Sequence, residues 1–280
     1  QARVVVGADG RVTGIRGHDK GGPTVTEQAR VVVGADGRHS LVAAAVDVPR
    51  YHEKAPLLCA YYTYVSGMSI GGRFESYDRP SRGIAAWPTN DDLTLVIAGW
   101  PYAEFEANRR DVEGNVLKTL DLVPGLAERF HAGRRETRWV GTPVLNYFRT
   151  PFGPGWALVG DAGYNKDYIT AFGITDAFRS AELCVEALDA AFTGARPFDE
   201  AMGDYQARRD EHALPFYEFT TQIAALQPAP PEQQQLMAAV HGNREAMDGF
   251  ARVLAGVTSP AEFFSDENVA RIFAAAGGRA

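Results

Sequence analysis

Apolar residues follow different spacings in different parts of the chain. Between about residues 56 and 150 they alternate in short runs broken by Gly, Pro, Asn and Asp, which predicts strands joined by turns. After residue 173 they recur every three or four positions, which predicts a helix; these residues are Ile174, Ala177, Phe178, Ala181, Val185, Leu188 and Phe192. Amphipathic helical segments continue after Pro197. The pattern therefore predicts an α/β fold with a helical C-terminal tail.

The alternating region gives the individual strands. Its runs cover residues 57–65, 73–77, 83–87 and 93–99. Asn90-Asp91-Asp92 is the clearest hairpin turn among them. A helix is expected over 102–120 and a further strand over 138–146. In the tail we expect helices over 199–211, 215–226 and 232–257, and a last one that starts at Ser259.

An apolar run at 156–159 predicts a short buried strand. It ends in Gly160-Asp161 and passes through a polar, aromatic loop into the helix that begins at Gly173 or Ile174. A carboxylate after a strand, followed by free amides at a helix start, can bind a ligand. Lys166 and Asp167, in the loop, are expected to be solvated charges or a local ion pair.

An eleven-residue segment, QARVVVGADGR, occurs twice, at 1–11 and at 28–38. The residues that follow the two copies differ, so the repeat is not a solenoid period. We expect the first copy to form only a strand, and residues 11–16 and 24–30 to form a hairpin whose turn is Gly21-Gly22-Pro23. In the second copy, a strand at 29–33 should precede a tight turn, with Ser40 capping a short helix over 41–46.

Composition and net charge argue against several classes of protein function. The chain has 280 residues, 45% hydrophobic and 22% charged, which is typical of a globular protein of one or two domains. A net charge of -7 without a long basic block argues against a nucleic-acid partner. The apolar runs are too short to span a membrane. Cys59 and Cys184 are expected to be buried thiols in a reducing cytoplasm, and the scattered histidines predict no metal site.

Two of these segments resemble motifs of one family. The stretch around Gly160-Asp161 is similar to the "GD" segment, and residues 31–40 to the "DG" segment, of FAD-dependent aromatic hydroxylases of the para-hydroxybenzoate hydroxylase-like family. The resemblance implies an FAD/NAD(P)-binding flavoprotein-monooxygenase-like α/β fold with an antiparallel substrate sheet. It divides the chain into a flavin-domain part with the DG motif (1–55), the substrate sheet (56–150), the flavin-domain return with the GD motif (151–194) and a helical region (195–280). That last region would cover the flavin domain or form a homodimer surface.

The resemblance also implies site residues. The cofactor-binding candidates are Asp36, Gly37, Gly160, Asp161, Ala162, Phe172, Gly173 and Ile174. By analogy the two acids lie near the ribose, ribityl and pyrophosphate groups of FAD, and the amides at 172–174 face the pyrimidine edge of the flavin ring. Reduced flavin carries negative charge at that edge, which a helix N-terminus stabilises. Weaker candidates for a substrate pocket are Tyr62, Tyr64, Trp87 and Trp100, for which ordinary sheet packing is the alternative.

The implied activity is that of an FAD-dependent monooxygenase. NAD(P)H would reduce FAD, and O2 would form a flavin C4a-hydroperoxide that hydroxylates an aromatic or polyketide-like molecule. Because the cofactor carries this chemistry, no catalytic side chain is expected. The family's third motif, GxGxxG, does not occur in the printed sequence. Alanines at 43–45 stand where many members have an arginine, and Tyr164 and Tyr168 where many have histidine and proline.

Three alternatives stay open. A truncated, non-catalytic flavoprotein-like fragment would bind a small hydrophobic ligand or a partner chain; the missing GxGxxG favours it, because that motif holds the ADP half of FAD. A flavin-dependent halogenase shares the fold, but its WxWxIP-like signature is not found here. A geranylgeranyl reductase-like enzyme is the third.

Overall fold

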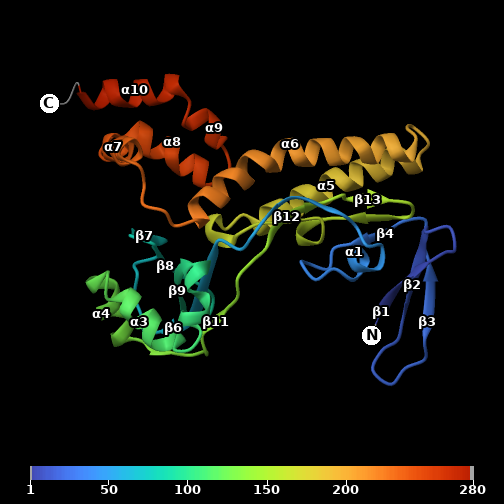
Figure 1. Cartoon of the computed structure of the whole chain (residues 1–280), viewed down its shortest axis with the longest axis horizontal. Coiled ribbons are helices and arrows are strands. Elements are labelled where there is room, and N and C mark those ends of the chain that lie inside the picture. Colours follow the sequence, from blue (N-terminus) through green and yellow to red (C-terminus); the bar gives the residue numbers. More distant parts are fainter. Residues whose placement is uncertain (1, 278–280) are drawn as a thin grey trace. The chain divides into compact units, whose positions relative to one another are not determined.

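The computed structural model describes residues 2–277, which fall into two compact units (Figure 1). Unit 1 contains Gln1–Ala55 and Leu145–Glu218, and unit 2 contains Pro56–Val144 and Phe219–Ala280. Each unit combines antiparallel strands with helices, and the part described after residue 230 contains only helices and their connections, up to residue 277. The predicted α/β fold class is confirmed.

Unit 1 has three sheets of three strands each. The first is the antiparallel sheet β1 (Ala2–Val6), β2 (Val12–Gly17) and β3 (Val25–Gln28). The second has the order β13 (Phe152–Gly153), β14 (Trp156–Leu158) and β4 (Val32–Gly34). The third has the order β15 (Tyr164–Asn165), β12 (Asn146–Arg149) and β5 (Arg50–Lys54). The predicted hairpin is confirmed, since Gly14 pairs with Gln28 and Gly17 with Val25.

The pairing of β4 with β14 is parallel, and it joins segments far apart in the sequence. Val32 lies opposite Trp156, and the amide of Val159 donates to the Gly34 carbonyl at 3.0 Å. A Cβ on Gly34 would lie 2.8 Å from Leu158 Cδ2 and 2.9 Å from Val42 Cβ. Only a glycine therefore lets α1 (Leu41–Ala45) pack this closely on the strand pair.

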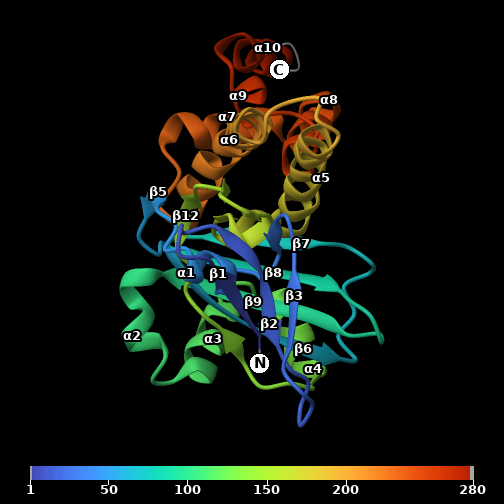
Figure 2. The ribbon, with the colours of Figure 1, turned by 90° about the vertical axis from the view of Figure 1, so that its right-hand side faces the viewer.

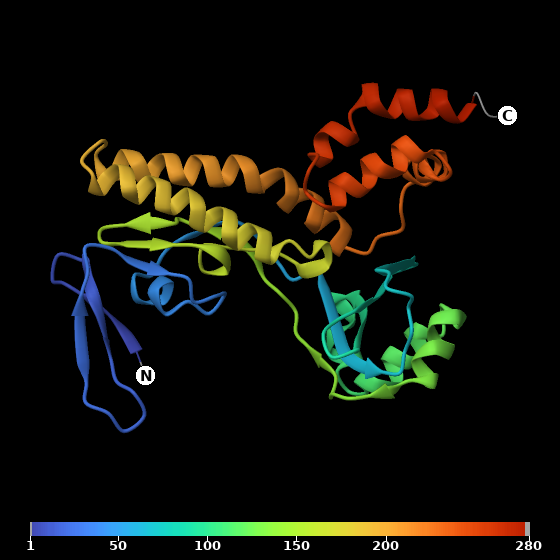
Figure 3. The ribbon, with the colours of Figure 1, turned by 180° about the vertical axis from the view of Figure 1, so that it is seen from behind.

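Two long helices cover this sheet. α5 (Gly173–Phe192) and α6 (Phe198–Ala224) run side by side (Figures 1 and 3), and α5 begins at the predicted residue. Their shared core with β14 comprises Ala157, Val159, Leu183, Cys184, Ala187, Leu188, Ala201, Met202 and Tyr205. Most of the apolar residues that predicted α5 are not its buried face, because Ile174 and Phe178 are each 75% exposed. β14 and α6 instead contact the face that carries Leu183 and Cys184.

Unit 2 is built on an antiparallel sheet with the order β10-β6-β9-β8-β7. Its strands are β6 (Leu58–Ser66), β7 (Glu75–Arg79), β8 (Arg82–Pro88), β9 (Thr94–Pro101) and β10 (Arg134–Arg135), with β11 (Val140–Gly141) paired to β6. The predicted hairpin turn is confirmed between β8 and β9, where Asp91 and Asp92 have positive φ angles.

Four helical segments lie between β9 and β10, and two expectations for this part of the chain were wrong. The predicted single helix over 102–120 is the 3-10 turn η1 (Tyr102–Glu104), α2 (Phe105–Asn108) and α3 (Val112–Leu120). The break comes at Asp111, whose Oδ1 accepts from the Gly114 amide at 2.9 Å and starts a new helix. The predicted strand over 138–146 is divided, since only Val140–Gly141 (β11) pairs with β6 and Asn146 begins β12. α3 and α4 (Pro124–Ala132) pack on one sheet face (Figure 2), where Trp100, Leu120 and Leu126 are buried.

The C-terminal helices are α7 (Pro231–Val240), α8 (Arg244–Leu254), α9 (Pro260–Phe263) and α10 (Asp266–Gly277). The expected helix over 232–257 is therefore two helices, because Asn243 Oδ1 accepts from the Ala246 amide at 3.3 Å and caps α8. The segments expected at 199–211 and 215–226 form one helix, α6, which tolerates Pro215 in its interior. Among the described helices, none combines the length and apolar composition needed to cross a bilayer.

Candidate functional site

Two loops that carry acids leave the same edge of the β4–β14 pair. Asp36 comes two residues after β4, and Asp161 comes three residues after β14. Because the two strands are parallel, their carboxyl ends meet at one edge. Ligands of open α/β sheets bind at such edges. The structure therefore brings together the two segments that the sequence singled out.

Asp36 is partly engaged in holding α1. Its Oδ2 accepts hydrogen bonds from the amides of Leu41 at 2.6 Å and Val42 at 3.4 Å. Ser40 Oγ accepts from the Ala43 amide at 3.0 Å, which confirms the predicted cap. Gly37 lies in the turn between Asp36 and Ser40. The Asp36 carboxylate thus fixes the start of α1 at the sheet edge.

Asp161 is the acid left free at this edge. It lies in the 3-10 turn η2 (Gly160–Ala162), is exposed, and forms no side-chain hydrogen bond among residues 2–277. Partial desolvation by the surrounding protein raises the pKa of its carboxyl, and the Lys166 ammonium opposes this shift. Gly160 has a φ of +56°, and its amide donates to Ser180 Oγ at 2.8 Å. Ala162, the last residue of this turn, is fully buried.

The start of α5 is open to an anion. Phe172 occupies the N-cap position and provides no side-chain hydrogen bond. A Cβ on Gly173 would meet no atom within 4 Å, and Ile174 is exposed. The first amides of a helix have no intrahelical partner and carry the positive end of its dipole. This helix start can therefore donate hydrogen bonds to a negatively charged group.

Of the two expectations for Lys166, a solvated charge or a local ion pair, the structure shows an ion pair, but its partner is Asp176 rather than the neighbouring Asp167. Their side chains are only 4% and 14% exposed. Burial lowers the pKa of Lys166 and raises that of Asp176, in each case against the attraction of the partner. The ammonium also lies 4.8 Å from the ring centroid of Tyr164 and 5.8 Å from that of Phe172. The expectation that Lys166 is solvated was wrong, because the aromatic loop and α5 enclose it.

Asp167 is also buried, at 1% exposure, so the solvated interpretation was wrong here too. Its Oδ1 accepts from the Ile169 amide at 3.0 Å, while Oδ2 has no hydrogen-bond partner. Its own amide donates to Asn146 Oδ1 at 2.7 Å. Burial raises the pKa of the Asp167 carboxyl to about 7. An ionisable group with such a shifted pKa is typical of functional loops.

Two buried arginines support the loop after β14. Arg149 Nη1 donates to the Ala162 carbonyl at 2.8 Å, and burial lowers the pKa of its guanidinium. Arg209 Nη2 donates to the Arg149 carbonyl at 3.1 Å and to the Tyr51 hydroxyl at 2.5 Å. No motif surrounds either arginine, so the sequence offered no signal for them. They hold the backbone that presents Asp161.

The substrate-pocket candidates lie in unit 2, on its central sheet. Tyr64 pairs across the sheet with Leu95, which pairs with Trp87, so these side chains share one face with Tyr62. The rings of Tyr62 and Tyr64 are 6.0 Å apart. Trp100 is on the opposite face, fully buried in the core beneath α3 and α4. The structure thus groups three of the four aromatic residues and separates Trp100 from them.

Known structures share this fold, although no protein-family model and no curated protein matches the chain. The myxobacterial chondrochloren halogenase CndH is similar with a TM-score of 0.71 and 20% identity, over 98% of this chain and 67% of that one. The flavin-dependent brominase Bmp2 has a TM-score of 0.73 and 16% identity, over 99% and 69%. PqsL from P. aeruginosa, in complex with 2-aminobenzoylacetate, has a TM-score of 0.65 and 21% identity, over 80% and 62%.

The chain has the fold of FAD-dependent halogenases and monooxygenases. This confirms the predicted flavoprotein-monooxygenase-like fold. Against PqsL it spans less than two thirds of the longer chain. At these identities the likeness concerns the fold alone.

Proposed function

We propose that this chain is part of an FAD-dependent oxidoreductase, a monooxygenase that uses NAD(P)H and O2 to hydroxylate an aromatic or polyketide-like molecule. The observation that carries the proposal is the edge of the β4–β14 pair. There two acid-bearing loops leave adjacent parallel strands, and Asp161 keeps a free carboxylate. The fold of FAD-dependent enzymes supports the same assignment.

The residues at this edge fit the flavin half of FAD. The Asp161 carboxylate can accept hydrogen bonds from ribityl hydroxyls, and Asp36 and Gly37 would lie near the ribose and pyrophosphate. The amides of Gly173 and Ile174 can donate to the pyrimidine edge of the ring, where the open space beside Gly173 admits a planar group. When bound, FAD would supply the redox and oxygen chemistry.

The chain's own residues would bind and orient the cofactor. The α5 dipole favours negative charge on the ring edge. Lys166 and Asp176 fix the loop that leads from Asp161 to α5, because their ion pair joins that loop to the first turns of the helix. Tyr62, Tyr64 and Trp87 are the proposed substrate-facing residues. No side-chain acid or base is required by this scheme.

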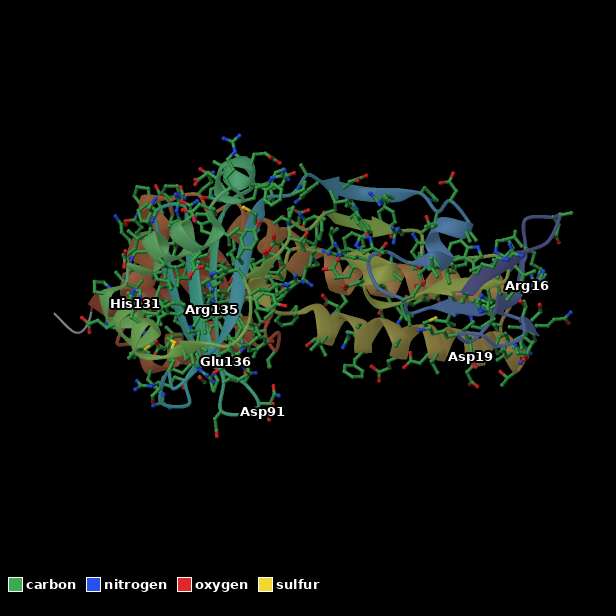
Figure 4. The ribbon with its side chains drawn as sticks, turned by 90° about the horizontal axis from the view of Figure 1, so that it is seen from below. Arg16, Asp19, Asp91, His131, Arg135 and Glu136 are labelled. Atoms are coloured by element: carbon green, nitrogen blue, oxygen red, sulfur yellow. The ribbon has the colours of Figure 1, made fainter. Side chains whose placement is uncertain are left out.

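A visible absorption spectrum of the purified chain, titrated with FAD and separately with FMN, tests the proposal. We expect a bound-flavin spectrum that NAD(P)H bleaches and air restores. Asp161→Ala should weaken flavin binding by about 10-fold or more, because a hydrogen bond to a charged group is lost. Asp19→Ala, an exposed acid on the β2–β3 hairpin (Figure 4), is the matched control and should bind like the parent. A chain that takes up neither flavin contradicts the proposal and favours the non-catalytic, ligand-binding alternative.

The halogenase alternative is favoured by the likeness to CndH and Bmp2. Products formed by the flavin-loaded protein with and without bromide separate the two reactions. Hydroxylated product in both conditions supports the monooxygenase, whereas brominated product that requires the halide supports the halogenase.

A further inference from the structure

A groove of about 390 Å³ lies at the other end of α5, between the turn that joins α5 to α6 and the amino-terminal end of β4. Arg11, Arg30, Phe192 and Phe198 are among its lining residues. Phe192 comes nineteen residues after Gly173, which corresponds to about 28 Å along α5. The groove is therefore distinct from the proposed flavin edge, and all its residues belong to unit 1.

Two guanidinium groups in this groove lack an acidic partner. Arg11 Nη2 donates to the Arg30 carbonyl at 3.2 Å, which holds the two residues together. The Arg30 guanidinium lies 3.8 Å from the ring centroid of Phe192. Among residues 2–277, neither arginine forms an ion pair, whereas the nearby Arg196 and Arg208 both do. An anion would thus meet two guanidinium groups whose positive charge no nearby ion pair neutralises. The paired N–H donors of each group match the geometry of a carboxylate.

Apart from the two arginines and Asp199, the groove is lined by apolar and aromatic residues. Phe192 is 40% exposed, and Phe198 packs edge-on against Phe152 with a centroid distance of 6.4 Å. Val31 adds an aliphatic wall, and Asp199 lies at the groove as its acidic residue. Its negative charge disfavours a ligand that carries two negative charges. The volume lies within the range of small-molecule sites, about 300–1,000 Å³.

We propose that this groove binds a planar aromatic monocarboxylate. The carboxylate is held by the guanidinium groups of Arg11 and Arg30, and the ring lies against Phe198 and the part of Phe192 that Arg30 leaves exposed. This site does not depend on flavin binding, and its occupation can be measured in the same protein with or without FAD.

Isothermal titration with naphthoate tests the site. Arg30→Gln is expected to raise the Kd for naphthoate by about 10-fold, since it removes the stacked, charged fork. Arg16→Gln is the matched control, because Arg16 is an exposed arginine on β2 (Figure 4) that does not line the groove. The Kd of this variant should equal that of the parent. Uncharged naphthylmethanol should bind more weakly than naphthoate, and added salt should weaken naphthoate binding.

Two further variants keep the result independent of folding. Arg30→Lys keeps the charge without the planar fork and should give an intermediate Kd, and Phe192→Leu should weaken naphthoate while leaving the melting temperature close to the parent's. Equal Kd values for Arg30→Gln and the parent would overturn the proposal. So would inorganic phosphate binding as tightly as naphthoate, or no heat of binding up to about 10 mM naphthoate, where even a millimolar site would be detected.

Discussion

The Lys166 ammonium is bonded to the Asp176 carboxylate in a setting that excludes most water from both groups. Lys166 comes from the loop after β14, and Asp176 from the first turns of α5. Desolvation acts against both charges, as the lowered pKa of Lys166 and the raised pKa of Asp176 show. The pair therefore depends on both partners, and removing one leaves the other charged and buried.

Lys166→Met should lower the free energy of unfolding by about 3–5 kcal/mol at pH 7, the cost of an unpaired buried charge. Urea unfolding measures this change. The loss should be smaller at pH 5, because Asp176 can then take up a proton. Lys166→Met combined with Asp176→Asn should recover most of the stability. A loss below about 1 kcal/mol in the single variant would mean that the pair is as weak as a surface ion pair.

Asp167 should make the protein less stable as the pH rises. The pKa of its carboxyl is about 7 in the folded protein against 3.8 as the ordinary value, so the folded state binds the proton more tightly. Its stabilising contribution is complete below pH 3.8 and is lost as the pH rises through about 7. At about 1.36 kcal/mol per pKa unit, the loss is at most about 4 kcal/mol.

Asp167→Asn removes this titration and keeps an oxygen for the Ile169 amide. Melting temperatures from pH 4 to pH 8 should therefore favour the variant increasingly as the pH rises, with a plateau above pH 8. If the difference in melting temperature between variant and parent were constant across this pH range, the titration of Asp167 would not be its cause.

The two copies of the repeat provide a matched test of packing. A Cβ on Gly34 would meet Leu158 and Val42 side chains at 2.8 and 2.9 Å. On Gly7 it would meet the end of the exposed Asp9 side chain at 2.8 Å and the Arg11 carbonyl oxygen at an ordinary contact distance of 3.5 Å. Gly34→Ala should cost about 1–3 kcal/mol through overpacking, and Gly7→Ala less than about 0.5 kcal/mol. Chemical denaturation of both variants gives the comparison. Equal losses would contradict the close packing of α1 on β4 and β14.

Removing the equivalent acids of the two copies, Asp36 and Asp9, should also lower stability by different amounts. Asp36 accepts from two amides at the start of α1, while Asp9 Oδ1 accepts from the Arg11 amide at 3.1 Å in an exposed turn. Asp36→Ala should lower stability by about 1 kcal/mol, the usual value of a helix cap, and Asp9→Ala by less. Thermal unfolding distinguishes them. A larger loss for Asp9→Ala would show that α1 does not depend on the Asp36 carboxylate.

Local sequence was sufficient for many of the individual elements. Alternating apolar residues located the strands of unit 2, Ser40 marked the start of α1, and the glycine after the polar loop marked the start of α5. Short-range signals failed where a capping side chain divides a helix, as at Asp111 and Asn243. For the candidate site, sequence indicated Asp36 and Asp161 but not Lys166, Asp176, Arg149 or Arg209. These residues are candidates only because the fold places each of them beside a partner that no sequence motif indicates.

The two copies of the repeat show that tertiary structure, and not local sequence, decides how a strand pairs. Residues 2–6 form an antiparallel strand with β2, while the matching residues 29–33 of the second copy overlap β4, which pairs in parallel with β14. Identical side chains have identical local preferences, so only their neighbours can select between the two structures. Residues 32 and 156 meet because β14 and α5 supply the buried surface that β4 completes. That long-range pairing brings the two acid-bearing loops to one edge and so creates the candidate site.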